Sequence, residues 1–418
     1  MGRMRRIVDF LALKKSIVGM LSMVVLVGMG EHMAEKFLPL YLEELTRDIA
    51  FKLSVGILSI GLLGFMDDML SALYSFPGGY LSDRLGHKRA LLVFNLISMA
   101  GYLIVIFVSR WWAVLLGAAF FISWSAISLP ASMELIARVV PKTRRAMGVS
   151  VQALVRRIPK TLGPFVGGAF IAFWGVSDGV RLAFVLALAL ALLALIMQQV
   201  LIEDDRKDGK RKEAEGNPLR LWARMNPDLR SLLTSDILIR FCERIPDLLV
   251  ALWVKDNLIA TGRMTLAHAA YLFGILCVIE NVTAVLCYVP VAHMADRFGK
   301  KPFVAITFGF FTLFPLTLYF CHSFWPLVGV FVLRGLKEFG EPTRKALIMD
   351  LAPEDRKAAM FGLYYLVRDV IVSFAALGGC FLWMYSPALN LFTAFAFGVI
   401  GTTWFIFRGR DLSAQPAA

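Results

Sequence analysis

About twelve apolar stretches follow one another along this chain, each of roughly 20 residues or more, and they restrict its possible folds more than any other feature. A helix of roughly 20 apolar residues crosses the hydrocarbon core of a bilayer. The composition agrees, because 58% of the 418 residues are hydrophobic, well above the usual share in a soluble globular protein. We therefore predict an all-α membrane protein rather than a soluble helical enzyme. The twelve predicted spans are 16–42, 55–81, 90–109, 111–137, 147–174, 178–201, 232–255, 268–294, 302–321, 325–350, 359–383 and 386–407.

The positions of Lys and Arg predict the orientation of these helices, since cytoplasmic loops carry an excess of both residues. With the N-terminus inside, the inner segments hold about 26 of the 44 Lys and Arg residues and the outer loops hold about 6. We expect a multi-pass protein of the cytoplasmic (inner) membrane with both termini in the cytoplasm. The net charge of +13 then reflects this topology and attraction to an anionic lipid surface.

Other uses of the charges and of the cysteines are not indicated. The bases are scattered over many loops, so we expect no binding to nucleic acid. The five cysteines fall in spans of the second half without paired spacing, which favours neither disulfides nor a metal site, and we expect no cofactor. They are Cys242, Cys277, Cys287, Cys321 and Cys380. The first span contains Glu31, Glu35 and Lys36 and lacks a cleavage-site pattern, so we expect it to be retained rather than removed as a signal peptide.

Pairs of similar segments indicate that the chain is internally duplicated. GGYLSDRLGHKR (78–89) and AHMADRFGKK (292–301) both follow a long apolar run, about 213 residues apart. In SLPASMELIARVVPKTRRAM (128–147) and GEPTRKALIMDLAPEDRKAA (340–359), a Pro is followed eleven residues later by a second Pro and then by a basic pair. A duplicated membrane protein of this kind is typical of transporters.

A single change of composition divides the two halves. The segment EDDRKDGKRKEAEGNPLR (203–220) is rich in charge and lacks apolar periodicity, which is typical of a flexible linker. We predict two pseudo-symmetric six-helix bundles, at 1–201 and 231–418, joined by a cytoplasmic linker at 202–230. The first spans of the two bundles also resemble each other, with EKFLP (35–39) matching ERIPD (243–247).

The segment after the second span carries the pattern G-x-L-x-D-R-x-G-x-K-R. Its residues are Gly79, Leu81, Asp83, Arg84, Gly86, Lys88 and Arg89. The second copy keeps Asp296, Arg297, Gly299, Lys300 and Lys301 and has Ala292 in place of the leading Gly. With the twelve spans and the charged linker, this pattern resembles the major facilitator superfamily of secondary transporters, and the resemblance covers essentially the whole chain. It implies that spans three, six, nine and twelve face lipid while the other eight line a central cavity.

The repeated motif is a candidate gate. Gly79 and Gly86 permit close backbone approach and tight reversal, and Asp83 lies where it can cap a helix N-terminus or pair with bases. The resemblance implies that this contact closes the cytoplasmic side. The other residues that we assign to the gate are Arg84, Lys88, Arg89, Asp296, Arg297 and Gly299. The alternative is a solvated loop with anchoring bases.

Two further fragments bear on the direction of transport. GPFVGG (163–168) resembles a Gly-Pro motif of drug/proton antiporters, and Gly163, Pro164, Gly167 and Gly168 would kink the fifth span and allow close helix packing. Packing alone is the alternative explanation. In the first span, Glu31, Glu35, Lys36 and Phe37 are similar to the E-x-x-E-R-F of peptide transporters, but the carboxylates are one residue further apart and Lys replaces Arg.

Many ionisable residues fall at bilayer depth, where they normally face a partner or a water-filled cavity. In the seventh span, Asp236, Arg240, Glu243, Arg244 and Asp247 recur at three- and four-residue steps and so share one helix face. The charges avoid the interiors of spans three, six, nine and twelve. The substrate-binding candidates are Lys36, Arg156, Arg157, Lys160, Arg240, Arg244, Glu280, Arg334, Lys337, Glu338, Glu341, Arg368 and Asp369. The alternative is that alternating signs in spans seven and ten neutralise each other as ion pairs.

Proton coupling requires a carboxylate that takes up and releases a proton as access alternates. The candidates are Glu31, Glu35, Asp67, Asp68 and Glu243, with Glu31 and Glu35 preferred. Glu280 could instead be held by Asn281 or a backbone group. Arg156, Arg157 and Lys160 share one face of the fifth span and need anions, which either acids of other spans or a substrate supplies.

The sequence thus predicts a secondary active transporter that works by alternating access, with proton-coupled efflux of a small charged or amphiphilic organic molecule preferred. Arg156, Arg157, Lys160 and Arg368 would hold an anionic moiety. The alternative within transport is proton-coupled uptake of an organic anion or a peptide-like zwitterion. The alternative of another class is a non-transporting sensor or scaffold on the same fold. We expect no enzymatic activity and a monomer whose partners are the lipid bilayer and its small-molecule substrate.

Overall fold

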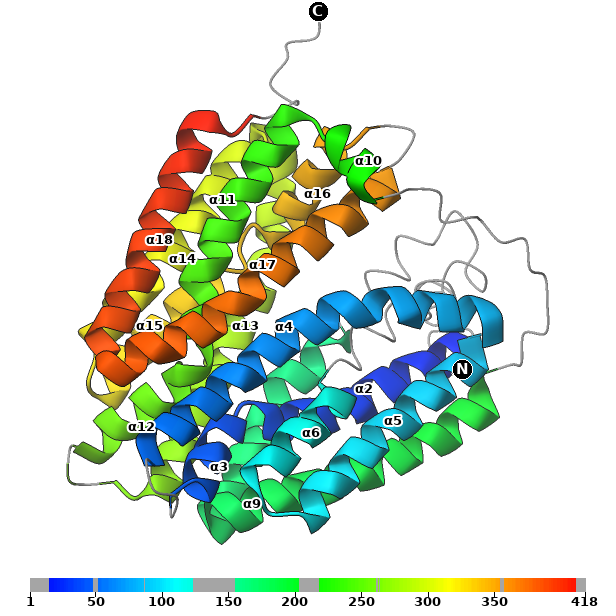
Figure 1. Ribbon diagram of the computed structural model, residues 1–418, viewed down its shortest axis with the longest axis vertical. Coiled ribbons are helices and arrows are strands. Elements are labelled where there is room, and N and C mark those ends of the chain that lie inside the picture. The colour runs from blue at the N-terminus through cyan, green and yellow to red at the C-terminus, as the bar shows by residue number, and fades with distance from the viewer. Residues whose placement is uncertain are drawn as a thin grey trace, which may run out of the picture. The chain divides into compact units, whose positions relative to one another are not determined.

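The structure is a computed structural model. It describes residues 15–47, 52–85, 87–122, 155–202, 218–260, 262, 264–353 and 357–410. These residues are almost entirely helical and include no strand (Figure 1). The all-α class predicted from the apolar stretches is confirmed.

The helices follow the predicted spans closely, and their bounds are as follows. In the first half they are α2 (Lys15–Glu35), α3 (Leu38–Leu45), α4 (Lys52–Leu85), α5 (His87–Phe107), α6 (Trp111–Phe121) and α9 (Arg157–Leu201). In the second half they are α10 (Pro218–Ala223), α11 (Pro227–Arg244), the 3-10 turn η2 (Asp247–Leu249), α12 (Val250–Ala260), α13 (Leu266–Phe298), α14 (Lys301–Tyr319), α15 (Phe324–Leu336), α16 (Glu341–Leu351), α17 (Lys357–Tyr385) and α18 (Pro387–Arg408). Within α9, Gly175 adopts φ 80° and ψ 176°, so this element is two helices that meet where the fifth and sixth predicted spans meet.

The chain divides into two compact units. The first unit comprises Met1–Asp48 and Leu70–Arg211, and the second comprises Ile49–Met69 and Lys212–Ala418. The helix α4 therefore belongs to both, because its N-terminal part packs within the second unit and its C-terminal part within the first. The division into bundles at 1–201 and 231–418 stays a prediction. The sequence repeat does not indicate that the segment 49–69 belongs to the second unit.

The predicted linker at 202–230 is partly helical. Helix α10 and the start of α11 lie within it, and the apolar side chains of Leu221, Met225 and Leu229 are buried in the core of the second unit. Asn226 caps α11 by accepting a hydrogen bond from the backbone N–H of Asp228 at 3.1 Å, with Pro227 at the first helical position. The high charge of the segment hid these apolar residues from a composition-based prediction. Residues 203–217 lie outside the described residues.

Among the residues that the structure describes, three predicted spans are interrupted. The first breaks between Glu35 and Leu38, the seventh between Arg244 and Asp247, and the tenth between Leu336 and Glu341. The first two breaks fall within the similar segments EKFLP and ERIPD, whose proline cannot continue the hydrogen bonds of the preceding turn. The internal repeat thus marks equivalent breaks in the two halves.

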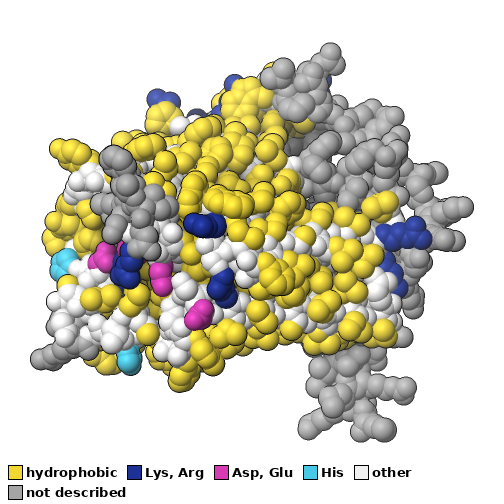
Figure 2. Space-filling view, turned by 60° about the horizontal axis from the view of Figure 1, so that its bottom comes forward, with side chains coloured by type: hydrophobic (Ala, Val, Ile, Leu, Met, Phe, Trp, Pro, Cys, Tyr) yellow, Lys and Arg dark blue, Asp and Glu magenta, His cyan; other side chains and the backbone are white. Residues whose placement is uncertain are grey.

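Eight helices among the described residues are long and apolar enough to cross a membrane. Large apolar side chains cover the outer faces of several of them, such as Val200 on α9 and Ile400 on α18, which are 66% and 55% exposed. Hydrophobic side chains also dominate the face seen in Figure 2. Apolar surface on this scale is unfavourable in water and favourable in lipid, which supports a multi-pass membrane protein.

Small residues allow the helices of each unit to pack closely. In the first unit, a side chain built on Gly30 of α2 would meet Ala187 of α9 at 2.8 Å. In the second unit, a side chain on Gly398 of α18 would meet Cys242 of α11 and Thr312 of α14 at 2.8 Å. Close approach of backbones through small residues is the usual basis of helix association in membranes.

Candidate functional site

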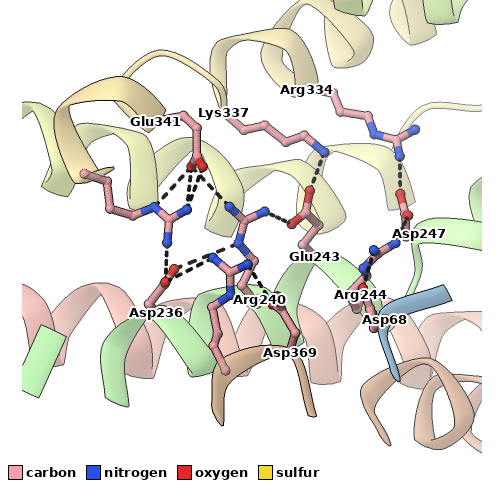
Figure 3. A network of polar contacts seen from close by, with 12 residues as sticks. Asp68, Asp236, Arg240, Glu243, Arg244, Asp247, Arg334, Lys337, Glu341 and Asp369 are labelled. Carbon is pink, nitrogen blue, oxygen red and sulfur yellow. Dashed lines mark hydrogen bonds and ion pairs between the residues drawn. The ribbon is translucent and has the colours of Figure 1, made fainter. Parts of the chain in front are cut away.

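Most of the buried charged side chains of the second unit form one network, which we call the charge network, and Figure 3 shows most of its members. They come from α4, α11, η2, α13, α15, α16 and α17. Its members are Asp67, Asp68, Asp236, Arg240, Glu243, Arg244, Asp247, Glu280, Arg334, Lys337, Glu341, Arg344, Arg368 and Asp369. Glu280 joins the two ends of the network by facing both Arg334 and Lys337. Asp236, Arg240 and Glu243 follow one another at three- and four-residue steps along α11, so they share one face of that helix, as the sequence predicts.

One end of the charge network is rich in bases. Asp236 and Arg344 pair with each other, and both side chains are only 1% exposed. Around the same carboxylate, Arg368 Nη1 lies at 3.5 Å and Arg240 Nε at 3.9 Å, and the hydroxyl of Tyr364 donates a hydrogen bond at 3.0 Å. Asp236 is thus held by three guanidinium groups and one hydroxyl.

The middle of the charge network joins α11 to α15 and α16. Arg240 donates to Glu243 at 2.6 Å and to Glu341 at 3.1 Å. Arg344 donates to the same Glu341 at 2.7 Å, and Lys337 donates to Glu243 at 2.7 Å. The alternating signs in spans seven and ten therefore neutralise each other, and the geometry favours the ion-pair interpretation for these residues.

Glu280 of α13 belongs to the same network. Its carboxylate lies 3.4 Å from Arg334 Nε and 3.7 Å from Lys337 Nζ. Asn281, which the sequence suggested as its partner, donates instead to the carbonyl of Cys277 at 2.9 Å. That expectation is wrong because the Asn281 amide satisfies the helix backbone four residues earlier, whereas bases of α15 and of the break after it approach the Glu280 carboxylate.

The other end of the charge network is rich in carboxylates. Arg244 donates to Asp67 at 3.2 Å and to Asp247 at 3.0 Å, and it also pairs with Asp68. Arg334 completes this end by pairing with Asp247. Asp67 and Asp68 are carried by the part of α4 that belongs to the second unit, so Arg244 ties that helix to α11.

Three charged candidates lie beside this network or at its edge. Arg368 donates to its neighbour Asp369 at 2.7 Å as well as facing Asp236. Glu338 is half-buried in the break between α15 and α16. A buried charge without a partner would cost several kcal/mol, which explains why these spans carry both signs at matched helical steps.

The first unit contains a smaller cluster of charges on α2 and α9. His32 Nδ1 lies 2.6 Å from Glu35 Oε2, and Glu31 is only 4% exposed. Arg156 lies within electrostatic range of Glu31, and Lys160 within that of Glu35. Acids of the first span therefore face the bases of the fifth, as one of the two alternatives predicted. Lys36 also lies within range of Glu35, and Arg157 is half-buried.

The glycine-rich motif of the fifth span packs against this cluster. A side chain built on Gly163 would meet His32 at 2.9 Å, and one on Gly167 would overlap the carbonyl of Met33. Pro164 lies inside α9 and, like Gly168, is buried. The motif therefore serves close packing of α9 on α2, which brings Arg156 and Lys160 to the carboxylates of α2.

The two copies of the repeated motif end long helices. Residues 79–85 form the last turns of α4, and α5 begins at His87, while α13 ends at Phe298 and α14 begins at Lys301. Gly299 adopts φ 87°, which glycine tolerates best. Among the described residues the motif is thus mostly helical rather than a turn, and in the second copy Gly299 and Lys300 separate α13 from α14. Gly86 lies outside the described residues, as do the side chains of Asp83, Arg84, Asp296 and Arg297, so the gating contact stays a prediction.

Lysines of the motif nevertheless have defined contacts. Lys88 Nζ donates to the carbonyl of Gln199 at 2.8 Å, and Gln198 donates to the carbonyl of Lys88 at 2.7 Å. These bonds join the start of α5 to the end of α9, whereas Arg89 is exposed. In the second unit, Lys300 pairs with Asp350 at the end of α16. Both copies therefore fasten the start of the following helix to a neighbouring helix.

Two polar residues of the second unit were not singled out from the sequence. Tyr364 supports Asp236, and Asn390 donates to the carbonyls of Ile245 at 3.1 Å and Gly379 at 2.7 Å. The carbonyl of Ile245 lies at the break of the seventh span, so Asn390 satisfies an acceptor that the broken helix leaves open. A single Asn in an apolar span was the only signal available.

Comparison with known proteins places the chain in a family. Residues 16–255 and 250–418 match the family model described as the Major Facilitator Superfamily, and together they cover nearly the whole chain. The chain belongs to the major facilitator superfamily. The resemblance drawn from the repeated motif is confirmed, and with it the predicted twelve-helix, two-bundle fold.

Other proteins of this superfamily match over most of their length. A protein of Lactococcus lactis named "Multi-drug resistance efflux pump PmrA homolog" is 22% identical, over 91% of this chain and 89% of its own. A "Na(+), Li(+), K(+)/H(+) antiporter" of Planococcus maritimus is 24% identical, over 78% of this chain and 87% of its own. The crystal structure of the nucleoside transporter NupG shares the fold with a TM-score of 0.74 at 12% identity, covering 93% of this chain and 99% of that one. As a member of this superfamily, the protein is a multi-pass membrane transporter of small molecules and not an enzyme.

Proposed function

We propose that this protein exports a small charged or amphiphilic organic molecule in exchange for protons. The observation that carries the proposal is the carboxylate-rich end of the charge network, where Asp67, Asp68 and Asp247 gather around Arg244. Carboxylates in membrane spans are costly and commonly mark proton pathways. The relatives named as an efflux pump and as a cation/proton antiporter support export and proton exchange.

The substrate class follows from the charges that the chain keeps within its spans. Arg156, Arg157 and Lys160 on α9 would hold an anionic moiety of the substrate, and Arg368 is a further candidate. Glu31 and Glu35 already face two of these bases, so an anionic group of the substrate would compete with these acids for them. A purely apolar drug would gain nothing from such groups. The substrate therefore carries at least one charged group beside its apolar part.

Transport in purified proteoliposomes with an internal pH dye tests this proposal. With the lumen acidic, addition of an exchanged substrate should make the lumen more alkaline, because protons leave as substrate enters. Organic anions, cations and dipeptides are added in turn, and liposomes without protein serve as the control. A substrate-dependent acidification of the lumen would indicate uptake by symport instead. Saturable uptake without any change of lumenal pH would overturn proton coupling.

A further inference from the structure

The side chain of Asp68 has one oxygen bound and one oxygen buried without a hydrogen bond. Asp68 is 8% exposed, and its Oδ1 pairs with Arg244. Its Oδ2 is inaccessible to solvent and has no hydrogen-bond partner among the described residues. A buried carboxylate oxygen without a donor is an unfavourable arrangement, which one added proton relieves.

The surroundings of Asp68 contain more acids than bases. The charged groups that face it are Asp67 on its own helix, Arg244 of α11 and Asp369 of α17. Arg244 is shared with Asp247 as well as with Asp67. At the opposite end of the charge network, Asp236 has three guanidinium groups and a tyrosine hydroxyl. Asp236 is thus stabilised as an anion, whereas Asp68 competes with two other carboxylates for one base.

We propose that Asp68 binds the transported proton and that its protonation loosens the attachment of α4 to Arg244. This inference rests on the proposed proton-coupled function and replaces Glu31 and Glu35 as the preferred proton carriers. Glu35 has a close partner in His32, at 2.6 Å, and Glu31 lies in the field of Arg156. Asp68 combines burial, a base shared with two other carboxylates and a buried oxygen without a hydrogen bond among the described residues. Oδ1 of Asp236 likewise has no hydrogen bond, but three guanidinium groups surround that carboxylate, whereas Asp68 has one.

The proton step changes only charge and hydrogen bonding. A proton from the aqueous phase adds to Oδ2 of Asp68, and the carboxylate becomes a neutral acid. Arg244 keeps its charge and its bonds to Asp67 and Asp247, while its attraction to Asp68 weakens. The reverse step returns the proton to water and restores the full ion pair.

The packing of α4 suits a reversible attachment. Gly61 faces Cys380 and Gly64 faces Ala376, so this part of α4 lies on α17 through small side chains. Phe65 and Phe374 make an edge-on ring contact with centroids 5.3 Å apart. Contacts through small side chains bring the two helices close together. The ion pairs to Arg244 are the polar part of this attachment and add specificity to the position of α4.

A metal ion is a poor alternative occupant. Among the described residues, no three His, Cys, Asp or Glu side chains are arranged as metal ligands. The guanidinium of Arg244 also binds all three carboxylates of this end, with Asp67 and Asp68 on one nitrogen and Asp247 on the other. A guanidinium in that position repels a metal cation, whereas a single proton needs only the one oxygen of Asp68 that has no hydrogen bond, Oδ2.

Infrared difference spectroscopy of the purified full-length protein tests the proposal with protons as the only ligand. Titration from acid to alkaline pH should remove the carbonyl band of a protonated carboxylic acid, and the band should shift in heavy water. In Asp68→Asn this band should be lost. The matched control Asp67→Asn, one residue away and 30% exposed at the side chain, should keep it. Asp68→Glu restores a carboxyl group and should give a band at a shifted position.

Transport separates failure of this inference from failure of the proposed function. With a substrate identified in the liposome assay, Asp68→Asn should retain exchange of labelled for unlabelled substrate but lose coupled proton movement by about tenfold or more. Retention of the band in Asp68→Asn overturns the inference, even where the wild type moves protons. Loss of the band in Asp68→Asn, in a wild type that moves no protons, overturns the proposed function and leaves Asp68 as a proton site without transport. Thermal unfolding of each variant checks that it is folded.

Discussion

At the scale of single residues, most of the buried charges that the structure describes in the second unit have a partner of opposite sign. Asp236 and Arg344 are both 1% exposed, and their separation of 108 positions in the sequence makes them a long-range pair. Removing one partner of a buried pair leaves the other as an uncompensated charge, whereas removing both leaves only apolar surface. The pair therefore acts as a unit, and the cost of a substitution depends on what is left behind.

Arg344→Met is expected to lower the free energy of unfolding by about 3–5 kcal/mol, because Asp236 then stays charged among fewer bases. The double variant Asp236→Asn with Arg344→Met should recover part of that loss. Lys345→Met, the neighbouring residue with a side chain 51% exposed, is the control and should change stability by less than about 0.5 kcal/mol. Thermal unfolding in detergent measures all three. Equal effects of Arg344→Met and Lys345→Met would contradict this account.

At the scale of helices, the sequence predicted the spans well and their interruptions poorly. Length and apolarity are local properties, so all twelve predicted spans contain a described helix. The breaks after Glu35, Arg244 and Leu336 depend on prolines and glycines whose effect is decided by neighbouring helices, as when Asn390 satisfies the carbonyl of Ile245.

The sequence likewise predicted the local part of the candidate site, the shared helix face, but not the partners from distant parts of the chain. The helical spacing of Asp236, Arg240 and Glu243 indicated a shared face, which the structure bears out. The partners could not be derived, because Asp68 and Arg244 lie 176 positions apart and only tertiary packing brings them together. The same reason applies to Glu280, for which the sequence offered Asn281 or a backbone group, whereas its bases Arg334 and Lys337 come from a distant part of the chain.

Helix packing on α17 gives a prediction from two adjacent glycines. A side chain on Gly379 would overlap the backbone of Ile245, whereas one on Gly378 would meet no atom within 4 Å. Gly379→Ala should therefore destabilise the protein by about 1–3 kcal/mol. Gly378→Ala should leave stability unchanged or raise it by up to about 1 kcal/mol, because alanine favours the helix. Thermal unfolding of the two variants compares them directly, and equal destabilisation would count against close packing at Gly379.

At the scale of the whole molecule, the second unit is assembled from two separate stretches of chain. The segment 49–69 comes from the first half of the sequence, and its described part packs on α17 and η2 of the second half, with Gly64 facing Ala376 and Leu248. Neither the composition nor the repeat indicates this, because α4 reads as one uninterrupted apolar helix.

Cutting the chain between Arg211 and Lys212 tests this assembly. The fragment 212–418 expressed alone lacks residues 49–69 and should be recovered in much lower amount than when it is co-expressed with fragment 1–211. Co-purification of the two fragments from detergent measures their association. Full recovery of fragment 212–418 by itself would mean that the α4 segment adds little to the second unit.

The sharing of α4 also has a consequence for recombination between relatives. A crossover in the segment 203–217 exchanges the second halves of two genes but leaves the stretch 49–69 with the first half. Each chimera then presents one parent's Gly61, Gly64 and Asp68 to the other parent's α17 and Arg244. We therefore expect functional chimeras when residues 49–69 are exchanged together with the second half. The unit that relatives can exchange then consists of two separate stretches of chain, 49–69 and 212–418.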